Sequence, residues 1–356
     1  MGVETAPGAG AGLTSGTGAA ASLKTIADEA GVSISTVSRA FTRPELIGEG
    51  TRTQILAIAE RVGYQPNRSA RGLVTGRTSM LGLLVPDIAN PFFPPLVRAA
   101  EDRAYERGYA VLLMDTDEHA DRERLLLRDL TGRVDGLVVC SPRSPTGQLR
   151  EIAQQRPIVL VNRTIPGVTS VSCSTRDGLG QLVDHLHGLG HRRIVYLAGP
   201  ASSWSDRERR SSVRQQAGRR GMEVDVLGPF PATFSGGVLA GDAIVASGGT
   251  AAVAFDDVVA LGAVRRLSEL GYDVPGKISV SGCDDIFFSG MTMPSLTTVA
   301  TPIAQAGRTA VDLLLDQLDG RARAQQVSLS GEFVARGSTG PVARAGAARA
   351  TKRRRG

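Results

Sequence analysis

The 356-residue chain is poor in several features, and each shortage excludes a class of protein. It has only three cysteines (Cys140, Cys173 and Cys283), without Cys-x-x-Cys spacing, which fits buried thiols in a reducing compartment rather than a disulfide framework. No apolar run approaches the ~20 residues that a membrane span needs. The first 21 residues have neither a basic start nor a continuous apolar stretch, so they do not resemble a secretory signal. We therefore expect a cytoplasmic protein without a membrane segment.

Motifs of common catalytic sites are also missing. The sequence contains no nucleophile-elbow glycines with an ordered Ser-His-Asp set, no phosphate-binding loop and no Gly-x-Gly-x-x-Gly at a strand-to-helix turn. His185 and His187 are two residues apart on a predicted helix, so they do not share a face as zinc ligands would. We therefore predict a protein that is not an enzyme, with no catalytic residues, no metal site and no cofactor.

Length and charge indicate several parts. A chain of 356 residues, 42% of them hydrophobic, exceeds the usual size of a single core. Residues 341–356 hold six basic side chains and no acids, whereas residues 22–78 hold eight basic and five acidic ones. Residues 1–21, rich in Gly and Ala, and the basic residues 341–356 have the composition of disordered extensions. The positive balance of residues 22–78 suits contact with phosphate groups.

Residues 22–62 show helical spacing in three short segments. Apolar residues recur at i, i+3, i+4 and i+7 from Leu23, Gly31 follows as a C-cap, and Ser33 stands at the N-cap of residues 34–40. Two helices joined by a tight glycine turn form a helix-turn-helix, which a third helix over about 51–62 would complete. A small helical bundle without a DNA partner would give the same pattern. The side chains expected to face outward are Ile34, Ser35, Ser38 and Arg39.

From about residue 79 strands and helices alternate. Short apolar runs at 80–85, 109–114, 136–140 and 158–161 are typical of buried strands, with helices over 95–107 and 121–131 between them. The alternation restarts with helices at 179–188 and 206–220 and strands at 194–198, 252–255 and 278–281. The pattern predicts an α/β fold with parallel sheets in two similar lobes, and ligand sites at the carboxyl ends of the strands.

Spaced motifs over residues 22–340 resemble the lactose/galactose repressor (LacI/GalR) family of bacterial transcription factors. They lie at residues 23–33, 36–40, 63–67, 76–78, 82–87, 90–93, 133–137, 190–194, 294–299 and 334–340. The resemblance implies a DNA-binding headpiece over 22–66 and a hinge helix and linker over 67–78. Residues 79–340 would then form an effector-binding and dimerisation domain of the periplasmic-binding-protein type.

The resemblance also implies how that domain divides. The N-lobe would comprise about 79–175 and 300–320, and the C-lobe about 176–297 and 325–340. The chain would cross between the lobes near 174–178, 297–302 and 320–327.

For DNA, the resemblance implies a homodimer on a near-palindromic operator. Ile34, Ser35 and Arg39 match the positions that read bases in the major groove. Leu73 matches the hinge leucine that wedges between base pairs in the minor groove, and the effector would control whether this short helix orders. A flexible linker is the alternative. The expected phosphate contacts are Ser33, Thr36, Ser38 and Thr42, and the residues flanking Leu73 are Asn67, Arg68 and Arg71.

For the effector, the resemblance implies a sugar or sugar derivative bound between the lobes. Carboxylate, amide and guanidinium groups suit its hydroxyls, and aromatic rings suit its apolar faces. The sequence departs from the usual family pattern at three places that bear on the ligand's identity: Ser174, the pair Ser212-Val213, and Asp256. The rival interpretation is a solute-binding protein that does not bind DNA. The predicted effector contacts are Asp87, Asn90, Phe92, Phe93, Arg209, Phe230, Asp256 and Asp284.

Overall fold

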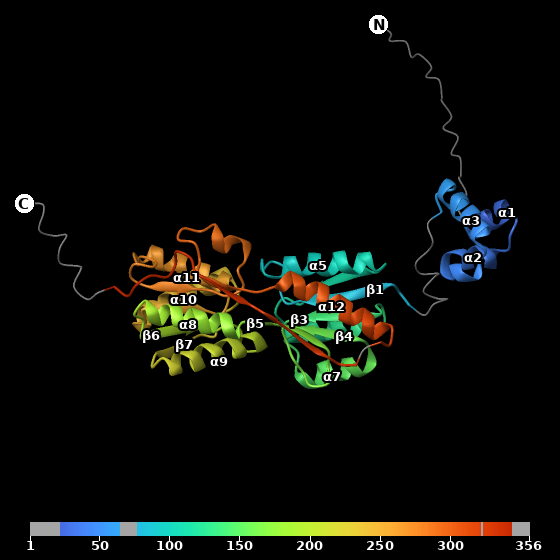
Figure 1. Cartoon of the computed structure of the whole chain (residues 1–356). Helices are drawn as coiled ribbons and strands as arrows, with labels where there is room; N and C mark the ends of the chain where they lie inside the picture. The colour runs from blue at the N-terminus through green and yellow to red at the C-terminus, as the bar shows by residue number, and fades with distance from the viewer. Residues whose placement is uncertain (1–21, 65–76, 322, 344–356) are drawn as a thin grey trace, which may run out of the picture. The chain divides into compact units, whose positions relative to one another are not determined.

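The computed structural model describes residues 22–64, 77–321 and 323–343, in two units, Met1–Arg77 and Thr78–Gly356 (Figure 1). The expected extension over residues 1–21, residues 65–76 of the expected hinge region and residues 344–356 lie outside the described residues. Among the described residues, no helix is both long and apolar enough to cross a bilayer.

The described part of the first unit is a helix-turn-helix, as predicted. Gly31 ends the first helix in the left-handed region at φ 67°. Ser33 begins the second, and its hydroxyl accepts a hydrogen bond from the N–H of Thr36 at 3.1 Å. The elements are α1 (Leu23–Ala30), α2 (Ile34–Thr42), the 3-10 turn η1 (Pro44–Leu46) and α3 (Glu49–Arg61). Their shared core contains Ile26, Ala27, Val37, Ala40, Ile55, Ile58 and Ala59.

The N-lobe of the second unit is a parallel sheet covered on both faces. Its strands are β1 (Met80–Val85), β2 (Ala110–Asp115), β3 (Gly136–Cys140), β4 (Ile158–Val161), β5 (Ser170–Ser174) and β11 (Gln326–Ser330). Their order is β11-β5-β4-β3-β1-β2. Successive side chains alternate, so Leu83 packs beneath α5 (Phe93–Glu106) and α12 (Ile303–Leu318). Leu84 packs on the opposite face, beneath α6 (Ala120–Thr131) and α7 (Thr146–Gln155).

The C-lobe repeats this plan with four parallel strands in the order β7-β6-β8-β9. These are β6 (Arg193–Leu197), β7 (Glu223–Leu227), β8 (Ala251–Ala254) and β9 (Ser279–Ser281). One face carries α8 (Arg176–Gly188) and α9 (Trp204–Arg219), and the other carries α10 (Phe234–Ser247) and α11 (Asp257–Glu269). Glycine is required where α10 meets α11, because a Cβ on Gly262 would lie 2.1 Å from the carbonyl oxygen of Phe234.

Two short antiparallel strands lie where the chain passes between the lobes, β10 (Thr298–Ala300) and β12 (Glu332–Val334). The expected crossing at 320–327 is wrong. Residues 326–330 form β11, which pairs with β5 in the N-lobe sheet, so the chain leaves this lobe at Gly331. The turn around Gly320 is visible in the sequence, but the pairing partner of the next strand is not. The remaining short element is η2 (Phe287–Gly290).

Candidate functional site

The outer face of α2 carries the predicted base-reading residues. Ile34 is 48% exposed, and Ser35 and Arg39 are exposed as well, whereas Val37 and Ala40 are buried. Within the described residues Arg39 has no ion-pair partner, so its guanidinium is available to an acceptor. This stripe presents one small hydroxyl side chain and one cation beside an apolar residue, a set that suits contact with base edges in the major groove.

The predicted phosphate-contacting hydroxyls differ in availability. Thr42 donates its hydrogen to the carbonyl oxygen of Ser38 at 2.8 Å, so it has no hydrogen left for a phosphate oxygen. The Ser33 hydroxyl lies 2.8 Å from that of Thr36 and caps α2. The structure therefore gives Ser33 and Thr36 a local role in starting the recognition helix, and Thr42 would have to rotate to reach DNA.

The predicted hinge contacts cannot be placed. Asn67, Arg68, Arg71 and Leu73 lie outside the described residues, so their role stays a prediction.

Arg209 is the centre of the C-lobe half of a cavity between the lobes. Its buried guanidinium, carried by α9, donates to the Asp284 carboxylate at 2.5 Å and to the carbonyl oxygen of Phe255 at 2.6 Å. The guanidinium carbon also lies 5.2 Å from the centre of the Phe255 ring. These contacts hold the arginine in one orientation at the cavity wall.

Two carboxyl groups stand beside Arg209 after strands β8 and β9. Asp256 begins α11 by accepting a hydrogen bond from the N–H of Val259 at 2.8 Å. Burial raises the pKa of Asp256 to about 6, against the lowering effect of that hydrogen bond. Burial also raises the pKa of Asp284 to about 7, although the Arg209 guanidinium opposes the shift. Burial therefore disfavours the charged form of both carboxyl groups.

The loop after β1 supplies aromatic and amide groups from the N-lobe. The rings of Phe92 and Phe93 meet edge to face with centroids 5.1 Å apart. The Asn90 side-chain oxygen accepts a hydrogen bond from the N–H of Phe92 at 3.0 Å, which fixes the loop. All three residues line the cavity that also contains Arg209, Asp256 and Asp284.

A second ion pair at this cavity was not among the predicted contacts. Arg143, which follows β3, donates through two nitrogens to the carboxylate of Glu118, one at 2.8 Å. Both residues line the cavity. Asp256 and Asp284 were predicted because they are polar residues just after strands. Glu118 follows β2 and Arg143 follows β3, so the same pattern could have identified them.

Four lining residues hold backbone angles that non-glycine residues rarely adopt. Glu118, Ser141, Asn162 and Asp284 have φ of 58°, 45°, 54° and 118°. Such strain persists only where the surroundings enforce it, and it gathers at functional sites. Its concentration around one cavity supports a binding role there.

Two predicted effector contacts do not line this cavity. The Asp87 carboxylate accepts a hydrogen bond from the N–H of Ala89 at 2.8 Å, a local turn contact, and Asp87 lines a separate apolar groove. Phe230 packs against the C-lobe core. Both follow strands, but the local turn directs them elsewhere.

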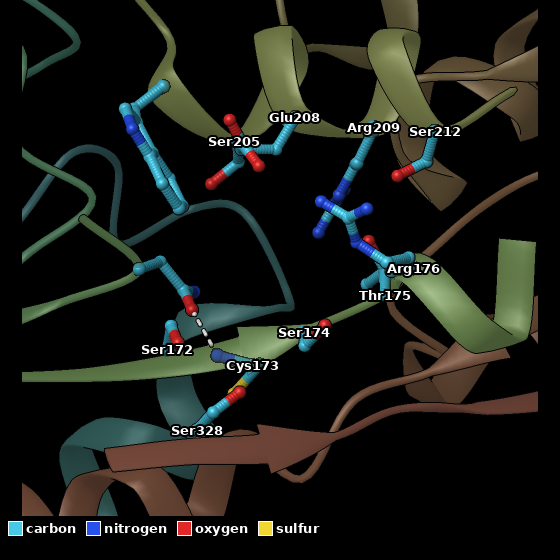
Figure 2. Close-up of a pocket in the computed structure, with 12 residues that line it drawn as sticks. Ser172, Cys173, Ser174, Thr175, Arg176, Ser205, Glu208, Arg209, Ser212 and Ser328 are labelled. Atoms are coloured by element: carbon cyan, nitrogen blue, oxygen red, sulfur yellow. Dashed lines mark hydrogen bonds between the residues drawn. The ribbon is translucent and has the colours of Figure 1, made fainter. Parts of the chain in front are cut away.

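A larger cavity of about 170 Å³ adjoins the first, and the two share Asn162, Ser205 and Arg209. Figure 2 shows it between α9 and the end of β5. At its edge the side-chain oxygen of Asn162 accepts a hydrogen bond from the N–H of Cys173 at 3.0 Å. The two cavities together form a cleft between the lobes, rich in hydroxyls and charged groups. Its other lining residues are Ser172, Ser174, Thr175, Arg176, Trp204, Glu208, Ser212 and Ser328.

Metal ligation has no support in the described ranges. Across residues 22–64, 77–321 and 323–343, no three His, Cys, Asp or Glu side chains converge as metal ligands. Of the acids of the cleft, Glu118 and Asp284 are paired with arginines and Asp256 caps a helix.

Sequence comparison finds two families along the chain. Residues 22–67 match the family model described as bacterial regulatory proteins, lacI family, and residues 183–339 match a periplasmic binding protein-like domain. The chain is 31% identical to the transcriptional regulator PtxS of Pseudomonas plecoglossicida, over 88% of this chain and 94% of that protein. It is 33% identical to the regulator GalR of Escherichia coli K12, over 85% of this chain and 90% of GalR.

Solved structures of similar regulators match both units of the chain. A lac repressor dimer bound to operator and the anti-inducer ONPF is similar with a TM-score of 0.80 at 28% identity, covering 90% of this chain and 99% of that one. A complex of the transcriptional regulator CelR with cellobiose is similar with a TM-score of 0.67 at 28% identity, covering 89% and 99%.

Proposed function

The chain belongs to the LacI family of bacterial regulatory proteins. We propose that a sugar-like effector controls its affinity for operator DNA. It is a DNA-binding transcriptional regulator with a separate effector domain. Repression is the proposed outcome. Residues 22–64 contact DNA through α2, with Ile34, Ser35 and Arg39 reading bases.

The observation that carries the effector proposal is the construction of the cleft from both lobes. Arg209 and Asp284 come from the C-lobe, whereas Arg143, Glu118 and Asn90 come from the N-lobe. A ligand that bonds to both halves favours one angle between the lobes and so changes the spacing of the attached headpieces. The CelR complex with cellobiose supports a hydroxyl-rich ligand.

A homodimer is proposed from an exposed apolar surface on the second unit. Phe288 lies in η2 and Met293 follows it, and their side chains are 48% and 97% exposed. They line a groove of about 740 Å³ together with Leu261 of α11 and Phe234 of α10. Apolar surfaces of this kind mark interaction sites, and the related lac repressor is a dimer on its operator. Paired headpieces then fit a near-palindromic site.

The rival function, solute binding without DNA, does not explain the helix-turn-helix of residues 22–64. A transport protein needs no helix-turn-helix with an exposed arginine on its second helix. The relatives PtxS and GalR are named as regulators, which supports a binding rather than a catalytic role. A protein that regulates transcription meets its DNA in the cytoplasm, and this is the proposed location.

The test is enrichment of genomic fragments by the full-length protein in the presence of excess bulk DNA. We expect a small set of near-palindromic fragments, released or tightened when a sugar, polyol or purine that raises the melting temperature is added. The variant Arg39→Ala should lose the enrichment while its melting temperature stays unchanged. Equal recovery of all fragments by the unaltered protein would contradict the proposal.

A further inference from the structure

The larger cavity of the cleft contains hydrogen-bonding groups that the protein itself does not use. Ser212 of α9 and Thr175, which precedes α8, are each only 7% exposed and line this cavity. Neither hydroxyl has a hydrogen-bond partner among the described residues. Because both hydroxyls open onto the same cavity, they are available to form hydrogen bonds with a polar group of a ligand.

The same end of the cavity is positively polarised. Helix α8 begins at Arg176, and no side chain caps its first turn. The first backbone N–H groups of a helix have no partner within it, and they carry the positive end of the helix dipole. Arg176 lines the cavity without an ion-pair partner among the described residues. Figure 2 shows Arg176 and Ser212 directed into the space between α8 and α9.

The other charges of the cavity do not cancel Arg176 locally. Arg209 is already matched by Asp284 at 2.5 Å. Glu208 also lines the cavity, but it is exposed, and Figure 2 shows it beside Ser205, apart from Thr175 and Ser212. One unmatched cation, two unpartnered buried hydroxyls and a helix start therefore converge at one end.

We propose that this end of the cleft binds an acidic group of the effector, a carboxylate or a phosphate, so that the effector is an acidic sugar derivative. Arg176 supplies the charge, and Thr175, Ser212 and the start of α8 supply hydrogen bonds. The inference rests on the proposed effector site and specifies the ligand class. Ser328 of β11 lines the same cavity from the N-lobe, so the acidic group would also bridge the lobes beside their crossing segments.

The test compares acidic ligands with their neutral parents on the full-length protein by calorimetry. Gluconate, glucuronate and glucose 6-phosphate form the acidic set, glucitol and glucose the neutral set, and sulfate the bare anion. At least one acidic member should bind about tenfold or more tightly than its parent. The carboxylate and phosphate members separate the two sources of the acidic group, and binding by sulfate alone would show an anion site unconnected to a sugar.

The variants make the test specific. Arg176→Gln should weaken the preferred acidic ligand about tenfold or more and leave the neutral parent within about twofold. Ser212→Ala should weaken it a few-fold, because one hydrogen-bond donor is lost. Arg207→Gln is the matched control, because Arg207 is an exposed arginine of α9, the helix that carries Ser212, and it does not line the cavity.

Three results would overturn the inference: equal binding of acidic and neutral ligands, no binding by any acidic ligand, or an Arg176→Gln variant with unchanged preference. None of them touches the proposed regulatory function, because genomic-fragment enrichment by the same protein tests that separately. Loss of enrichment with a preserved acidic preference would instead remove the regulatory proposal and keep this site.

Discussion

The carboxyl group of Asp256 provides a quantitative test of the cleft electrostatics. It is buried, it caps α11, and burial raises its pKa from 3.8 to about 6. The variant Asp256→Asn keeps the cap and the shape but removes the charge. We expect this variant to be more stable than the unaltered protein above pH 6, with the two converging near pH 4.

The sign follows from proton linkage. Below pH 3.8 the carboxyl is protonated in both the folded and the unfolded chain, so its ionisation costs nothing. As the pH rises, the unfolded chain loses its proton first, and the free energy of unfolding falls until the folded pKa of about 6 is passed. The interval from 3.8 to about 6 corresponds to about 3 kcal/mol, at about 1.36 kcal/mol per pKa unit.

A neighbouring carboxyl adds to the same effect. The negative charge of Asp256 is one of the causes that raise the pKa of Asp284. Removing that charge makes ionisation of Asp284 easier in the folded chain, which also favours the variant at high pH. The figure of about 3 kcal/mol therefore describes Asp256 alone, and the response of Asp284 adds to it with the same sign.

The assay is urea unfolding of the full chain between pH 4 and pH 8. The single tryptophan, Trp204, begins α9 of the C-lobe, so its fluorescence reports on the lobe that contains Asp256. Asp256→Ala is the matched control, because it removes the charge and also the cap, worth about 1 kcal/mol at every pH. A difference between the Asn variant and the unaltered protein that is constant with pH, or that widens toward acid, would refute the reasoning.

Four further perturbations test other parts of the molecule. Arg39→Ala should cost about 1–3 kcal/mol on the enriched DNA fragment and less on random DNA, measured by fluorescence anisotropy; equal losses would assign Arg39 to phosphate contact. Leu73→Ala should reduce operator affinity and bending in gel mobility without lowering the melting temperature; unchanged bending would remove its wedge role. Arg209→Gln should cost about 3–5 kcal/mol of C-lobe stability near pH 8, because Asp284 loses its buried partner; tryptophan-monitored unfolding within about 1 kcal/mol of the unaltered protein would contradict this. Met293→Asp should shift the dimer toward monomer in sedimentation equilibrium, and an unchanged dimer would place the interface elsewhere.

Local signals were enough to predict the headpiece. Gly31 as a C-cap and Ser33 as an N-cap act within one turn of the chain, and both occur in the structure as predicted. The helical spacing that starts at Leu23 likewise placed Ile26 and Ala27 in the core. Caps and spacing depend on neighbours a few residues away, so they can be predicted without tertiary information.

Contacts between distant segments were not predictable in this way. Strand β11 joins β5, about 150 residues earlier in the chain, and only the sheet reveals that pairing. Arg143 meets Glu118 only because the ends of β2 and β3 lie side by side. Thr175 and Ser212 likewise line one cavity only because α8 and α9 pack together.

From the sequence alone, the chain's composition and short-range patterns determined its helix-turn-helix, its parallel α/β lobes and the class of polar residue that ends each strand. Those features follow from interactions along the backbone over a few residues. Which of the strand-end residues share a cavity was decided only by tertiary packing. It brought Arg209 to Asp284, placed Asp87 and Phe230 outside that cavity, and left Arg176 unpaired within the described residues, facing the cleft. Packing decides these positions because a side chain's direction depends on the local turn, and its neighbours depend on the whole sheet.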